Sequence, residues 1–238
     1  MSAPAQVILN TVTTIGTTES IAELGARQRD LLARAHAAQG DKAFAFTRRA
    51  AAHHEAGHAV VPALDGILTK YCKVKRKRLP GADTVSWIGF TDTDVPWSVT
   101  PDTSPENDAR NMRRIVAGWA SEILFEGDDL SLASSVDEAM IAGNIAAWIG
   151  HKLGEDPQAV FRVVMLGVLA DLTIHERYVR AIAAVLMRER MLRGPRLYRL
   201  LPPALSAPPA ERAYPAPLLS KLDDTMAALA ARLNGVGK

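Results

Sequence analysis

Residues 47 to 64 read Thr-Arg-Arg-Ala-Ala-Ala-His-His-Glu-Ala-Gly-His-Ala-Val-Val-Pro-Ala-Leu. This alanine-rich run predicts a helix that carries Arg48 to Leu64, and its hydrophobic residues indicate that the helix is buried. Within the run, His54 and His58 are four residues apart. Residues at this spacing lie on one face of a helix, so the two imidazoles can point to the same place.

The pattern His54-Glu55-x-x-His58 predicts a catalytic zinc site. Two imidazoles can ligate one ion, and Glu55 can reach a water molecule on that ion without ligating it. Zinc lowers the pKa of such a water toward about 7, so that the carboxylate can accept its proton and pass it to a leaving amine. The competing interpretation is a surface helix that carries two histidines and a glutamate by chance.

Composition indicates an ordinary globular protein of 238 residues, with 48% hydrophobic residues and a net charge of +2. This charge predicts neither a nucleic acid nor a membrane partner, and the basic run of residues 73–78 is interpreted as a solvated strand face.

The single cysteine, Cys72, excludes an intrachain disulfide and fits a reducing compartment. The N-terminus does not resemble a signal peptide, and no apolar run approaches the roughly 20 residues that span a bilayer. We therefore expect a cytoplasmic protein.

The flanking segments predict a mainly α fold with a small β-sheet. After a loose arm, helical spacing of apolar residues begins at Thr18. Further elements are expected as two or three short strands within 68–92, a loop over 92–108, and helices over 108–127, 136–152, 157–172, 174–192 and 218–233. The proline-rich stretch from Pro195 is expected to be extended and poorly packed. The predicted organisation is an arm and helix (1–45), a core domain (46–200) and a C-terminal segment (201–238).

Several segments resemble motifs of a known family, and they occur in the same order as in that family. They are Arg48–Val60, Gly89-Phe90-Thr91, Ala117–Gly127, Ala133–Ala139 and, more weakly, Ala183–Leu192. Together they resemble the peptidase domain of the FtsH family, membrane-anchored ATP-dependent zinc proteases. The order and rough spacing hold from about residue 46 to 200. The resemblance implies a zincin-like helical peptidase domain that binds Zn²⁺ and hydrolyses peptide bonds.

The resemblance also implies roles for individual residues. Asp137 matches the family's third zinc ligand, and Glu122 matches a glutamate that supports a ligand imidazole. Gly89-Phe90-Thr91 matches an edge strand that pairs with the substrate backbone. From the residues alone, the commoner explanation of Asp137 is a carboxylate at a helix N-terminus that interacts with the helix macrodipole. Glu122 is also the third ligand expected in a zincin of another lineage.

The departures from the family pattern limit what is expected. Trp119 stands in place of arginine and Val136 in place of asparagine, and Pro62 should kink the helix beyond the histidines. No G-x-x-x-x-G-K-[ST] motif is present. We therefore expect an ATP-independent metallopeptidase that acts on unfolded or peptide substrates, with a homo-oligomer as one option. The alternative is a catalytically silent zinc-binding or scaffold relative.

Overall fold

The computed structural model describes residues 47–78, 85–95, 103–126 and 136–235, and the helix expected after Thr18 lies outside them. The prediction of a mainly α fold with a small β-sheet is confirmed. The elements in chain order are α3 (Arg48–Leu64), β1 (Thr69–Arg78), β2 (Val85–Thr93), α4 (Pro105–Phe125), α5 (Val136–Leu153), α6 (Pro157–Ile174), α7 (Glu176–Glu189), β3 (Met191–Arg193), α8 (Gly194–Tyr198), the 3₁₀ turn η4 (Pro209–Glu211) and α9 (Ala216–Gly235).

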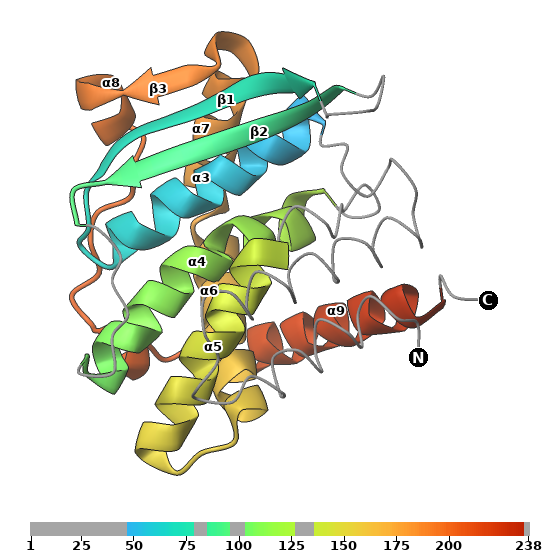
Figure 1. Ribbon diagram of the computed structural model, residues 1–238. Helices are drawn as coiled ribbons and strands as arrows, with labels where there is room; N and C mark the ends of the chain where they lie inside the picture. The colour runs from blue at the N-terminus through green and yellow to red at the C-terminus, as the bar shows by residue number, and fades with distance from the viewer. Residues whose placement is uncertain (1–46, 79–84, 96–102, 127–135, 236–238) are drawn as a thin grey trace.

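The sheet has three antiparallel strands in the order β2-β1-β3, and it covers one side of α3 (Figure 1). The side chains of Cys72 and Val74 in β1 are buried in the core. Strand β3 was not predicted, because the helix expected over 174–192 includes its first two residues. Since β1 occupies the middle, β2 is an edge strand, and one of its sides has no strand partner among the described residues.

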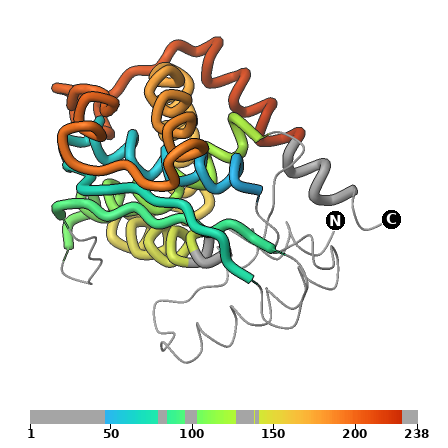
Figure 2. Tube along the Cα trace, turned by 90° about the horizontal axis from the view of Figure 1, so that it is seen from above, coloured from blue at the N-terminus to red at the C-terminus, as the bar shows by residue number. Residues whose placement is uncertain are grey.

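Helix α3 lies at the centre of the molecule, with the sheet on one side and α4 on the other (Figures 1 and 2). It begins where sequence analysis placed it, because the Thr47 hydroxyl caps it by accepting a hydrogen bond from the Ala50 N–H (3.0 Å). Gly57 allows α4 to come close, since a Cβ there would lie 2.3 Å from the Ala117 carbonyl oxygen. Pro62 lies inside the last turn, and the helix ends at Leu64.

The proline-rich C-terminal segment is better anchored than expected. Its Arg212 side chain is only 5% exposed and forms ion pairs with Asp65 (2.8 Å) and Asp171 (2.6 Å). Tyr214 donates a hydrogen bond to Asp171 as well (2.9 Å). The prediction of poor packing is therefore wrong at these residues, because long-range ion pairs hold a stretch whose local composition resembles a linker.

Helix α6 is relevant to the prediction that the chain has no membrane span, because it is long and apolar. Among the described helices, it alone is long and apolar enough to cross a membrane by length and composition, with 18 residues and a mean hydropathy of 1.5. It also passes through the protein interior, because Val168, Leu169 and Leu172 are fully buried. Its Asp171 forms a buried ion pair with Arg113 (2.5 Å). Because 39% of this apolar window is buried, the helix packs against the protein along only part of its surface. The absence of a membrane span and the cytoplasmic location both stay predictions.

Candidate metal centre

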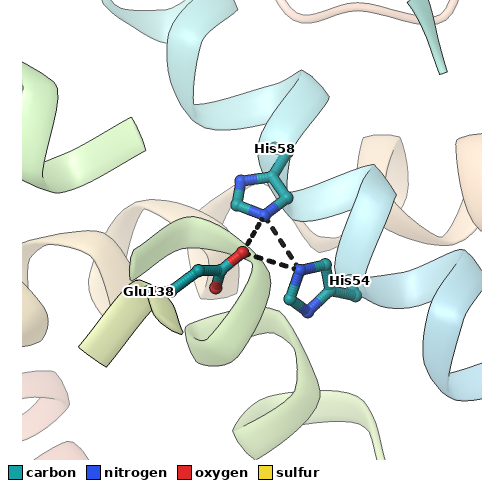
Figure 3. A group of neighbouring side chains, drawn as sticks. All are labelled: His54, His58 and Glu138. Atoms are coloured by element: carbon teal, nitrogen blue, oxygen red, sulfur yellow. Dashed lines mark hydrogen bonds and ion pairs between the residues drawn. The ribbon is translucent and has the colours of Figure 1, made fainter. Parts of the chain in front are cut away.

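Helix α3 brings the two motif histidines together on one face. The Nε2 atoms of His54 and His58 are 2.9 Å apart, and their rings meet edge to face (Figure 3). The four-residue spacing produces this convergence directly, because one helical turn separates the residues. His53 points elsewhere, toward Phe125 and Glu126.

The third group at the site is Glu138, from the first turns of α5. Its Oε1 lies 2.9 Å from Nε2 of His54 and 2.8 Å from Nε2 of His58 (Figure 3). These three side chains form the group with metal-ligand spacing among the described residues. Sequence analysis named the preceding residue, Asp137, whose backbone belongs to α5 but whose side chain lies outside the described part. Glu138 directly follows Asp137 in the sequence, and this adjacency was the feature that could have identified it.

The opposite ring nitrogens are held by acceptors. Nδ1 of His54 contacts Oε1 of Glu122, a fully buried residue of α4. Nδ1 of His58 lies 2.9 Å from the backbone carbonyl of Arg114, also on α4. A carbonyl oxygen only accepts hydrogen bonds, so His58 must carry its proton on Nδ1, and the same holds for neutral His54 facing a carboxylate. When both rings are neutral, their Nε2 atoms are therefore unprotonated.

Two unprotonated nitrogens and a carboxylate oxygen therefore face one another, an arrangement that calls for a cation between them. Without one, the cluster holds protons: burial lowers the pKa of His54, but Glu138 and Glu122 outweigh it and raise the pKa well above its usual value. Burial raises the pKa of Glu138, yet the two histidines bring it down to about 2. The second oxygen, Oε2 of Glu138, is buried and has no hydrogen-bond partner among the described residues. Two imidazoles and one carboxylate fit a zinc ion.

Glu55 lies next to this cluster and under strand β2. It is 4% exposed, and its Oε2 accepts a hydrogen bond from the Thr91 hydroxyl (2.6 Å). Burial raises the pKa of Glu55. Gly89 leaves space for the carboxylate, since a Cβ at residue 89 would lie 2.0 Å from Oε1 of Glu55. The motif glutamate is thus positioned by two residues of the segment that sequence analysis assigned to substrate binding.

Phe90 lies between Gly89 and Thr91, and its side chain points to the opposite face of the sheet, away from Glu55. Side chains alternate along a strand, and Phe90 is 51% exposed and stacks on Tyr71 of β1 (ring centroids 5.9 Å apart). The Lys73 ammonium lies over both rings. Only the backbone of Phe90 follows the same edge as Gly89 and Thr91.

The cluster opens into a cleft of about 590 Å³ between β2 and the helices. One wall is the Trp87–Thr93 part of β2, and the other carries Arg114, Ile115 and Ile141. A glycine of α4 closes the floor: a Cβ at Gly118 would lie 2.4 Å from Nε2 of His54 and 2.5 Å from Nε2 of His58. In the part of the chain that the structure describes, the cleft thus places a strand edge without a strand partner beside the candidate metal ligands and a buried carboxylate.

Sequence comparison adds no further identification. Neither models of known protein families nor the curated protein sequences match this chain. The functional assignment therefore depends on the geometry of the cleft.

Proposed function

We propose that this protein is a zinc-dependent metallopeptidase that hydrolyses peptide bonds in unfolded or peptide substrates without ATP. The observation that carries the proposal is the convergence of the two Nε2 atoms and the Glu138 carboxylate beside Glu55 and an open strand edge. A structural zinc site requires no adjacent carboxylate held apart from the ligands, whereas hydrolysis requires one. The resemblance to the FtsH-type peptidase domain agrees with this proposal.

Each side chain then has a defined task. His54, His58 and Glu138 would hold the zinc ion, which would supply Lewis-acid activation of the attacking water and of the scissile carbonyl. Glu55 would accept a proton from the attacking water and pass it to the leaving amine. Glu122 orients His54 through Nδ1, away from the metal-facing nitrogen, which supports an orienting role over that of a ligand.

The free edge of β2 offers backbone groups to an extended substrate. Strand addition of this kind supplies affinity through main-chain hydrogen bonds and needs a substrate whose own backbone is free. Gly89 and Thr91 would lie opposite the bond that is cut, because both touch Glu55. Folded proteins would therefore be poor substrates.

The test is zinc analysis combined with cleavage of casein or a quenched fluorescent peptide. Wild type should bind one zinc ion and show cleavage that a chelator abolishes. Glu55→Gln should keep the zinc and lose about 100- to 10,000-fold in rate, because it lacks only the base. Zinc-loaded wild type that cleaves no unfolded substrate would instead support a silent zinc-binding scaffold.

A matched pair of variants identifies the third ligand. Glu138→Gln should lose zinc, whereas Asp137→Asn should retain it, because Glu138 is the carboxylate that faces both histidines. The reverse result would assign the ligand to Asp137. Circular dichroism of both variants shows whether α5 is still folded.

A further inference from the structure

The feature that calls for a ligand is the side chain of Arg114, on the cleft-facing side of α4. This residue is only 8% exposed, and it lines the cleft. Its Nη2 donates hydrogen bonds to the Thr93 hydroxyl (2.5 Å) and to the Val95 carbonyl (2.7 Å). Its Nη1 donates to Oδ1 of Asn111 (3.3 Å). All of these acceptors are neutral.

The adjacent Arg113 is also buried on α4, but its charge is balanced by carboxylates. Arg113 forms ion pairs with Asp65 (3.1 Å) and Asp171 (2.5 Å), and these raise its pKa in spite of burial. Arg114 has no carboxylate within ion-pair distance in the described part of the chain. Burial lowers the pKa of Arg114, and the charges of Asp94 and Asp65, which act from farther away, only partly oppose this effect. A buried charge without a counter-ion is costly, so its retention in a cleft points to a partner from outside.

The nearby acids already have partners. Asp65 is paired with Arg212 as well as with Arg113. Asp94 uses its Oδ1 to accept a hydrogen bond from the Leu68 N–H (2.9 Å). Asp65 is thus shared between two other arginines, and Asp94 is exposed to solvent and forms no ion pair with Arg114 within the described residues.

The position of Arg114 along the cleft predicts where the partner group lies. Its anchor Thr93 is two residues beyond Thr91, which contacts Glu55. At about 3.3 Å per residue, this places the guanidinium about 7 Å from the proposed point of cleavage, measured along β2. A side chain or chain end about two residues from the scissile bond would reach it.

We propose that Arg114 forms a carboxylate-binding subsite at the Thr93 end of the cleft, so that the preferred substrates carry a carboxylate about two residues from the cleaved bond. This inference rests on the proposed peptidase function. A guanidinium binds a carboxylate in a planar, two-pronged geometry, and burial strengthens such a pair. In a polypeptide the carboxylate belongs to an Asp or Glu side chain or to a free C-terminus.

The test uses quenched fluorescent peptides in which one Glu is moved along an otherwise fixed sequence, each compared with its Gln counterpart. Wild type should prefer Glu at one position, about two residues from the cut, by tenfold or more in kcat/KM. In Arg114→Gln the ratio of Glu to Gln peptides should fall to about one, and Arg114→Lys should keep part of it. Arg110→Gln, an exposed arginine of the same helix, should retain the full preference.

A second peptide pair, with a free or an amidated C-terminus at the same position, separates the two carboxylate sources. Absence of any Glu or C-terminal preference in wild type overturns the subsite, as does a preference that survives in Arg114→Gln. Zinc-loaded Glu55→Gln provides a readout without turnover. If this variant binds Glu peptides about tenfold more tightly than Gln peptides while wild type cleaves neither, the subsite stands and the peptidase proposal fails.

Discussion

Gly89 and Glu55 lie so close together that a Cβ on residue 89 would lie 2.0 Å from Oε1 and 2.2 Å from Cγ of the glutamate. Gly89→Ala should therefore displace the proposed general base or the strand above it. We expect at least a 100-fold loss of kcat with zinc still bound, since a misplacement of about 1 Å costs that much. Gly167→Ala is the control, because its Cβ would meet nothing closer than 3.6 Å. Full activity in Gly89→Ala would contradict the assigned role of Glu55.

Glu122 should tune zinc affinity without binding zinc. Glu122→Gln keeps the shape of the side chain but removes the charge that faces Nδ1 of His54. Zinc affinity should fall about 10- to 100-fold, as measured by competition with a coloured chelator. The control is Glu126→Gln, one helical turn later, which contacts His53 and Arg49 instead. Equal losses in the two variants would show a general effect of charge on α4.

Zinc should stabilise the fold, because its ligands join α3 to α5. At a free zinc concentration 100 times the Kd, the free energy of unfolding should rise by about 2.7 kcal/mol. Urea unfolding in zinc and in chelator measures this difference. Glu138→Gln should show a much smaller difference. A wild type whose stability is the same in zinc and in chelator would argue against a preformed metal site.

The buried ion pairs of Arg212 should matter more than a surface pair of the same type. Arg212→Met leaves Asp65 and Asp171 without one of their two arginines, and should cost about 3 to 5 kcal/mol in the free energy of unfolding. Arg162→Met removes an exposed pair with Asp223 and should cost about 1 kcal/mol or less. Urea unfolding compares the two, and similar losses would mean that the C-terminal segment is not anchored by these charges.

Tyr214 gives a pH dependence whose sign is fixed. Burial and the charge of Asp171 raise the pKa of Tyr214 to about 12, above the value of about 10 in an unfolded chain. Its contribution is therefore complete below pH 10, and it declines as the pH rises through 12. Tyr214→Phe should be about 1 kcal/mol less stable at pH 8, and the difference should shrink above pH 10. Tyr198→Phe, at an exposed site, should show no such change.

The parts of the fold that follow from local pattern were predictable. The alanine run, the Thr47 cap and the His54–His58 spacing all belong to one helix, so α3 could be placed from its own residues. Strand β3 could not, because three residues form a strand only through pairing with β1. Likewise, the anchoring of Arg212 depends on acids far away in the sequence.

The third carboxylate shows the same limit inside the site. Neighbouring residues of a helix point about 100 degrees apart, so the rotation of α5 about its axis decides whether residue 137 or 138 faces the histidines. No local signal sets that rotation. It is determined by packing against α4 and α6, and the structure brings Glu138 to the cluster.

Anchoring of α3 by the C-terminal segment has a consequence for biosynthesis. Asp65, which directly follows α3, pairs with an arginine 147 residues later in the chain. At 5 to 20 residues per second, a ribosome needs roughly 7 to 30 seconds to cover that distance. Helix α3, which carries the histidines, is therefore among the first described elements to be synthesised, but its ion pair with Arg212 can form only much later. Chains cut short before Arg212 would carry the His54–His58 motif on a helix followed by Asp65, and a single arginine, Arg113, would be shared between Asp65 and Asp171.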